Sequence, residues 1–248
     1  MYDYKKSKEV VEKILQSPTK IVEKTYIPSS DDNFTYENGI KAWVGALFVD
    51  IVNSSELFRS ANEDTARIIR SFCSEIISIL KDDDNYREIG IRGDCVYCVY
   101  STSSQEDLVE IFRHSYRINT FLRMLNKLLS KNGYQNINAG IGLGCDQDLI
   151  IKAGQNGSGI NDKVWIGKAL VDASHLADIA NRNGISAIAM SPLFYDNIIE
   201  HLLKENQQYS NWIYPHYQSN GYYYNSNLDY YHCNVIETGF NNWIEKGM

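Results

Sequence analysis

No segment of the 248-residue chain is a continuous apolar run long enough to cross a membrane, and residues 1–6 lack the apolar core of a signal peptide. We therefore expect neither a membrane span nor a signal peptide. The chain also lacks an excess of positive charge: 24 lysines and arginines stand against 31 aspartates and glutamates, a net charge of −7. Because nucleic-acid-binding proteins carry a basic surface, we expect no nucleic-acid partner.

Cysteines are few and scattered, at positions 73, 95, 98, 145 and 233. An odd number without regular spacing excludes a disulfide framework and is typical of a protein of the reducing cytoplasm. Cys95 and Cys98 have the spacing of a metal or redox pair, but they lie inside a predicted strand. Residues three apart in a strand point to opposite faces, so we interpret both as core residues.

The hydrophobic content of 44% is sufficient for one domain with a substantial core. We predict a single domain over 1–248. It begins with a helix at 4–16 and a polar loop within residues 1–38, followed by a central core over 40–200. A C-terminal extension over 209–248 includes a tyrosine-rich stretch that we predict as a hairpin at 222–235.

The core is organised around the stretch 43–58. Its apolar residues alternate on both faces of a predicted strand at 41–50, which is typical of a central, covered strand. This strand ends on Asp50, and a helix follows at about 55–80, with Ser54 or Ser55 available as its N-cap. An acid beside a turn whose N–H groups can bind an anion suggests a metal–nucleotide site, although Asp50 could instead only cap the helix.

A second carboxylate lies at the tip of a predicted hairpin over 87–100, where Arg92 and Gly93 precede Asp94. The order of elements then continues with a helix at 105–130 and a strand at 136–144. This β-α-β-β-α-β order predicts an α+β fold with a ferredoxin-like core. Such a fold can bring Asp50 and Asp94 to one end of the sheet, where they repel each other unless a cation such as Mg²⁺ binds between them.

Further elements are predicted beyond this core. They are a strand at 148–154, a loop at 155–159, a helix at 168–182, a strand at 185–190 and a helix at 192–206.

Four motifs in order resemble those of the class III nucleotidyl cyclases, the family of adenylate and guanylate cyclase catalytic domains. Phe48-Val-Asp-Ile51 is similar to the first metal motif of the family, and Gly93-Asp94 to its hairpin motif. The stretches 137–144 and 165–176 resemble its glycine-containing strand and its Trp-Gly-x-x-Val-Asn-x-Ala-x-Arg-Leu motif. The resemblance covers most of residues 40–190.

The resemblance implies closure of a nucleoside triphosphate by attack of the ribose 3′-oxygen on the α-phosphorus, with release of pyrophosphate. It implies a homodimer with its sites at the interface and two ions, Mn²⁺ or Mg²⁺. Asp50, Asp94 and the backbone carbonyl of Ile51 would be the metal ligands. The triphosphate would be bound by the turn Val52, Asn53, Ser54 and Ser55.

The chain departs from the family in its fourth motif. Val171 and His175 occupy the positions of the transition-state Asn and Arg of the family, and Asp172 replaces the Asn if the register shifts by one residue. The triphosphate-binding lysine of the family has no clear counterpart, and Lys152 and Lys168 are its candidate substitutes.

The purine-reading side chains of the family are also missing, since Gly90 (or Ile91) and Val164 stand at their positions. Arg92 can donate to a base carbonyl, and Phe48 can narrow the pocket. The chain is thus most similar to the bacterial pyrimidine cyclases of the Pycsar anti-phage system, which implies cyclic UMP or cyclic CMP as product, with UTP favoured over CTP. Two alternatives stay open: a purine cyclase, and a catalytically dead homology domain that dimerises or binds nucleotides.

Overall fold

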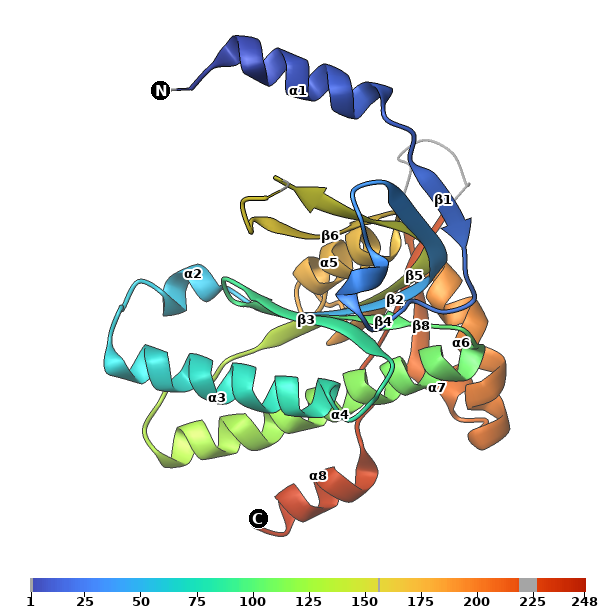
Figure 1. Cartoon of the computed structure of the whole chain (residues 1–248). Helices are drawn as coiled ribbons and strands as arrows, with labels where there is room; N and C mark the ends of the chain where they lie inside the picture. Colours follow the sequence, from blue (N-terminus) through green and yellow to red (C-terminus); the bar gives the residue numbers. More distant parts are fainter. Residues whose placement is uncertain (1, 156, 219–226) are drawn as a thin grey trace.

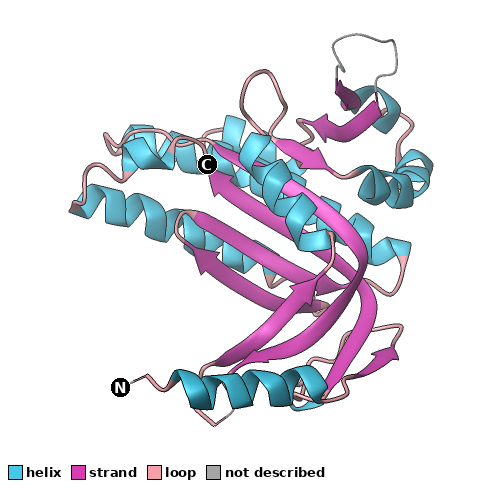
Figure 2. Ribbon diagram, turned by 90° about the horizontal axis from the view of Figure 1, so that it is seen from above, coloured by secondary structure: helices cyan, strands magenta, loops and turns pink. Residues whose placement is uncertain are grey.

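The computed structural model describes residues 2–155, 157–218 and 227–248. Nine strands of this part of the chain form one sheet (Figures 1 and 2). Seven follow the order β3 (Tyr86–Arg92), β4 (Cys95–Ser101), β2 (Asn38–Ile51), β5 (Ala139–Gly154), β7 (Ile188–Met190), β9 (Asn227–Cys233) and β8 (Ile213–Gln218). The other two are β1 (Lys20–Glu23), which pairs with β2, and β6 (Asn161–Ile166), which pairs with β5.

Helices cover both faces of the sheet (Figure 1). The main core lies between the sheet and α3 (Glu63–Leu80), α4 (Gln105–Lys131) and α6 (Pro192–Glu205). On the other face, α5 (Ala169–Ile179) packs through Ala169 and Ala173 on small residues of β2. The order β2-α3-β3-β4-α4-β5 confirms the predicted ferredoxin-like α+β core.

Strand β2 is the central strand that the sequence predicts. It pairs antiparallel with β4 on one side and with β5 on the other. Because both neighbours and both faces are covered, Val44, Leu47 and Val49 are fully buried. The strand delivers Asp50 to the end of the sheet, opposite Cys95 of β4 and Gly140 of β5.

Three alternate glycines of β5 allow α5 to lie directly on the sheet. A Cβ atom at Gly140 would lie 2.2 Å from the carbonyl oxygen of Ala177, and one at Gly142 would lie 2.0 Å from that of Ala173. At Gly144 the corresponding distance to the Ala169 carbonyl is 2.3 Å. Backbone atoms cannot give way as a flexible side chain can, so these glycines set the position of α5.

The predicted boundaries differ from the structure at several places. The helix expected at 55–80 is broken into a short α2 (Ser54–Leu57) and α3, because the Asn62 side chain accepts from the Thr65 N–H and starts a new helix. The N-cap of α2 is Asn53, not Ser54 or Ser55. The strands expected at 136–144 and 148–154 are one continuous strand, because β5 pairs along the full length of β2.

Later elements are also shifted. Helix α5 ends at Ile179 rather than 182, and the strand expected at 185–190 starts only at Ile188. The C-terminal hairpin is formed by β8 and β9, so its first strand lies before the predicted 222–235, and residues 222–226 of that prediction lie outside the described residues. Five elements were not predicted: β1, a 3-10 helix (Asp31–Asn33), β6, α7 (Tyr209–Trp212) and α8 (Thr238–Glu245).

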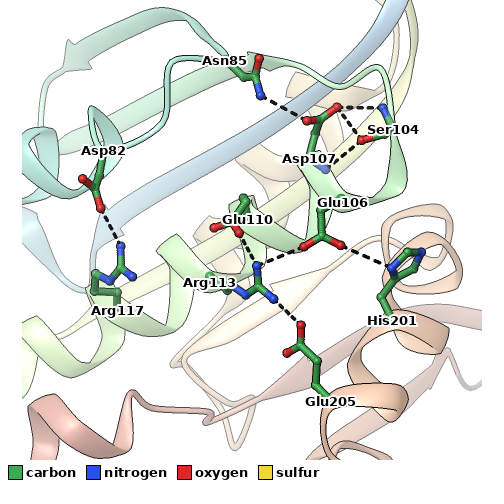
Figure 3. Close-up of polar contacts among 10 residues, drawn as sticks. All are labelled: Asp82, Asn85, Ser104, Glu106, Asp107, Glu110, Arg113, Arg117, His201 and Glu205. Carbon is green, nitrogen blue, oxygen red and sulfur yellow. Dashed lines mark hydrogen bonds and ion pairs between the residues drawn. The ribbon is translucent and has the colours of Figure 1, made fainter.

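An ion pair joins α6 to α4 (Figure 3). The guanidinium of Arg113 on α4 contacts Glu106, Glu110 and, on α6, Glu205. Ser104 and Asp107 form a capping box at the start of α4. The N-terminal helix α1 (Tyr4–Gln16) is different, because it projects from the body (Figure 2) and buries none of its residues. Among the helices described, none is long and apolar enough to cross a membrane.

Candidate active site

Asp50 and Asp94 lie side by side at one end of the sheet. Asp50 ends β2 and faces Cys95 of β4 in the strand register, and Asp94 immediately precedes Cys95. A two-residue turn joins β3 to β4, with its first residue, Gly93, in the left-handed region at φ 63°. Glycine adopts this conformation without strain, which is why the sequence turns tightly enough to hold Asp94 beside Asp50.

The environment of Asp50 is shaped by burial and by one arginine. Burial of the carboxylate raises the pKa of Asp50, and the negative charges of Asp94 and Asp178 raise it further. Arg182 opposes this shift by donating from Nη2 to Asp50 Oδ2 at 2.8 Å. Sequence reasoning did not identify Arg182, which lies 132 residues from Asp50 in a turn after α5 and carries no motif.

The groups at this position suit a hard divalent cation. Two carboxylates and the Ile51 carbonyl are oxygen donors, the type that Mg²⁺ and Mn²⁺ prefer. No group of three or more His, Cys, Asp or Glu side chains among the described residues could hold a metal ion, so phosphate oxygens would have to complete the coordination. Burial raises the pKa of the neighbouring Cys95 thiol to about 12, and these hard cations prefer oxygen to sulfur ligands.

The turn after β2 is only partly available for phosphate binding. The Val52 N–H donates to the Asn138 carbonyl at 2.8 Å, so the structure removes this amide from the predicted anion site. Asn53 has left-handed geometry, and the N–H groups of Ser54 and Ser55 lie in the first turn of α2, where they have no acceptor within the helix. The anion site that remains is therefore smaller than predicted.

A cleft of about 550 Å³ brings together residues that the sequence assigned to two different roles. The predicted base-pocket residues Phe48, Arg92 and Val164 line it, and so does His175, predicted to act on the transition state. Val171, which the sequence aligned with the transition-state Asn of the family, lines it as well. The remaining lining residues were not predicted; they are Glu88, Tyr97, Lys163, Trp165, Leu170 and Ser174. Asp50 and Asp94 are not among the lining residues, although Phe48 and Arg92 of the lining lie two positions before them in the chain.

Tyr97 fills the space above Gly90, the position aligned from the sequence with the purine reader of the family. A Cβ atom at Gly90 would lie 2.4 Å from the Tyr97 ring, so no side chain fits at Gly90 while the tyrosine is in place. The Tyr97 ring stacks on Phe48 with centroids 5.2 Å apart, and the Arg92 guanidinium lies 5.8 Å from the ring centroid. The Tyr97 ring, stacked on Phe48, thus occupies the space that a side chain at position 90 would need.

Glu88 is the acceptor at the centre of the cleft. Its two carboxylate oxygens accept from the Tyr97 hydroxyl at 2.6 Å and from Trp165 Nε1 at 2.9 Å. Burial and the hydrogen bond to Glu88 raise the pKa of Tyr97 to about 12, so this hydroxyl stays a donor at neutral pH. The sequence does show that Glu88 lies two positions before Gly90 and thus on the same face of the strand. It does not show the hydrogen-bond partners of Glu88, because Tyr97 lies on β4 and Trp165 on β6.

Two predicted residues do not reach the cleft. Asp172 is not part of the lining, and its charge interacts with Lys168 and Asp146. Lys152 lies near the end of β5 that is remote from Asp50, where its amino group is 5.9 Å from the ring centroid of Tyr36. Neither residue is brought to Asp50 within one chain.

A buried carboxylate lies beneath the helix that carries His175. Asp148 of β5 is fully buried beneath the start of α5, where a Cβ atom at Gly167 would meet its carboxylate. Neither oxygen has a partner at good hydrogen-bond geometry, and the backbone amides of Ala169 and Lys168 compensate only partly. Burial raises the pKa of Asp148 to about 6.

This carboxyl gives a testable dependence of stability on pH. The native state binds its proton more tightly than the unfolded chain, so its contribution to stability is present at pH 4 and is lost as the pH rises through about 6. We expect Asp148→Asn to raise the free energy of unfolding at pH 7.5 by up to about 3 kcal/mol and to leave it little changed at pH 4. Urea unfolding at both pH values measures this, with Asp162→Asn, an exposed aspartate of β6, as control; an equal effect at both pH values would contradict it.

Comparisons with known proteins agree with this geometry. No protein-family model matches the chain. A curated protein named uridylate cyclase from Treponema porcinum is 41% identical over 100% of this chain and 82% of its own length. A second uridylate cyclase, from Gulbenkiania mobilis, is 29% identical over 84% of this chain and 83% of its own length. The crystal structure of the adenylyl cyclase CyaB from P. aeruginosa matches 79% of this chain and 95% of its own, with a TM-score of 0.60 and 16% identity. The chain therefore belongs to the class III nucleotidyl cyclases, and its curated relatives in that family are uridylate cyclases.

Proposed function

We propose that this cyclase converts UTP to 3′,5′-cyclic UMP and pyrophosphate. The observation that carries the proposal is the cleft, in which the Tyr97 ring fills the space above Gly90 and Phe48 stacks against it. This bulk favours a one-ring base. Arg92 can donate to a base carbonyl, and Glu88 can accept from the uracil N3–H in addition to its two present donors. Cytosine offers an amino group and a carbonyl to the same pair, so the choice of UTP rests on the names of the relatives.

The proposed reaction forms a bond between the ribose 3′-oxygen and the α-phosphorus. It breaks the bond between the α-phosphorus and the oxygen that bridges it to the β-phosphorus, so pyrophosphate leaves. Asp50, Asp94 and the Ile51 carbonyl would hold two Mn²⁺ or Mg²⁺ ions, which supply activation of the 3′-hydroxyl and charge neutralisation of the triphosphate. The amides of Ser54 and Ser55 bind phosphate oxygens. His175 would stabilise negative charge on the reacting phosphate. The 3′-hydroxyl proton passes to solvent.

We further propose that two copies of the chain form each site. Within one chain Asp50 and Asp94 do not line the cleft, and apolar side chains at the cleft are exposed, Val164 by 40% and Val171 by 50%. A second copy that supplies the metal pair would cover them. By its resemblance to the Pycsar cyclases, the product would be a second messenger that activates a separate effector in anti-phage defence.

The test is incubation of the purified protein with each of the four nucleoside triphosphates and Mn²⁺, followed by chromatography and mass spectrometry. We expect cyclic UMP to form at least about tenfold faster than cyclic AMP or cyclic GMP. A tenfold ratio of rates corresponds to a difference in activation free energy of about 1.4 kcal/mol, which is about the contribution of one hydrogen bond to the base. Arg92→Ala should lower this rate, and Arg70→Ala, an exposed arginine of α3, should not. Equal or faster cyclisation of ATP would overturn the pyrimidine assignment.

A second candidate function is nucleotide binding without turnover. The replacement of the transition-state Asn and Arg by Val171 and His175 favours it. In that case none of the four triphosphates would be cyclised with Mn²⁺ or Mg²⁺, while at least one would still bind.

A further inference from the structure

The guanidinium of Arg182 occupies acceptors at the end of β2. Its Nη2 donates to Asp50 Oδ2 at 2.8 Å and, more weakly, to the Ile51 carbonyl at 3.4 Å. Its Nη1 donates to the carbonyls of Ala177 at 3.0 Å and Ala180 at 3.1 Å. One side chain thus joins the end of α5 to the end of β2. The two acceptors on β2 are groups to which the proposed function assigns a divalent cation.

The fold fixes this arginine in place. Asn181 and Asn183 on either side of it have left-handed backbones, with φ 58° and 51°. The Asn181 side chain donates to the Ala139 carbonyl at 3.1 Å, and Ala139 pairs with Ile51 in the sheet. The close packing of α5 on the glycines of β5 completes the arrangement. The Arg182 side chain is 80% buried, since its relative exposure is 20%.

Arg182 and a cation compete for the same oxygens. An arginine guanidinium is positively charged, so it cannot share a carboxylate oxygen closely with a divalent ion without strong repulsion. No other ion pair to Asp50 or Asp94 is formed in the described part of the chain. Removal of the guanidinium would leave the half-buried Asp50 carboxylate without its charge partner, which increases its attraction for a metal ion.

We propose that Arg182 is a resident counter-ion of the metal site, bound to Asp50 and Ile51 in the nucleotide-free protein and displaced from them when a divalent cation binds. The inference rests on the proposed function, because it requires that Asp50 and Ile51 bind the cation. Nη1 stays anchored to the end of α5 during the exchange, so the released Nη2 remains beside the site. Arg182 therefore lowers the affinity for metal when no nucleotide is present.

The experiment measures Mn²⁺ binding to the nucleotide-free protein by electron paramagnetic resonance of the free ion. We expect Arg182→Gln to bind Mn²⁺ about tenfold more tightly than the unaltered protein, as for the loss of one competing charge-assisted contact. Arg182→Lys keeps the charge but cannot bridge both sets of carbonyls, so its affinity should lie between the two. The control is Arg67→Gln, an exposed arginine of α3 that pairs with Glu63 and should not change the affinity.

Circular dichroism and a thermal melt identify which Arg182 variants are folded, and the folded variants decide the outcome. Mn²⁺ affinity that is unchanged or weaker in every folded Arg182 variant overturns the inference. Asp50→Asn separates this result from a failure of the proposed function. If Asp50→Asn loses Mn²⁺ binding while Arg182→Gln binds as the unaltered protein does, only the role of Arg182 is wrong. If Asp50→Asn binds Mn²⁺ normally, the metal site itself is wrongly assigned.

Discussion

Replacement of Asp50 or Asp94 by alanine is expected to lower cyclisation by a factor on the order of 10³ or more, the scale seen when a group that stabilises transition-state charge is removed. Each carboxylate would supply half of the negative charge that holds the ions. Asp94 lies at a turn, and the Asp50 side chain at the end of β2 keeps 22% of its surface exposed, so both variants should fold. The measurement is the initial rate of cyclic nucleotide formation at saturating Mn²⁺, together with the melting temperature.

The matched control is Asp178→Ala. Asp178 is exposed and contributes to the raised pKa of Asp50, but it lies on α5 and has no proposed role as a ligand. We expect its rate to stay within about threefold of that of the unaltered protein, because a solvent-exposed charge acts weakly at a distance. If either Asp50→Ala or Asp94→Ala cyclised at a near-normal rate, the two-metal assignment would be wrong.

The parts of the site that the sequence predicted depend on local patterns. The alternation around Val44–Asp50 predicts a central strand, and Gly93 predicts the tight turn that holds Asp94, because strand period and turn chemistry act within a few residues. The four motifs extended this reading to the family, which the relative from Treponema porcinum, matched over the whole of this chain, confirms. The roles of the individual site residues stay predictions.

The parts that were missed depend on contacts between distant segments. Arg182 reaches Asp50 only because the glycines of β5 let α5 pack against the sheet backbone. Glu88 meets Trp165, 77 residues away, only because β6 folds back along β5. Gly90 was read as a lost side chain, whereas the neighbouring strand supplies the Tyr97 ring in its place. Periodicity shows which face a residue occupies, but not which residue from another element will fill the space beside it.

Two inactive variants are expected to restore activity when they are mixed, if each site takes its metal pair from one chain and its cleft from the other. Asp94→Ala damages the metal half of a chain, and His175→Ala damages the cleft half. A mixed dimer would then contain one site with both defects and one site with none. Because mixing at equal concentrations gives half mixed dimers, about a quarter of the sites would be intact, so about a quarter of the unaltered activity should return.

The informative control mixes Asp50→Ala with Asp94→Ala. Both changes lie in the metal half, so every site in every dimer lacks one carboxylate and no activity should return. Size-exclusion chromatography with light scattering gives the mass of each sample and shows whether chains exchange. Recovery in the first mixture but not in the second would support shared sites. Only the first mixture can form a site in which one chain supplies an intact cleft and the other supplies both carboxylates. A monomer mass, or an absence of recovery although the chains exchange and His175→Ala alone is inactive, would contradict the shared-site arrangement.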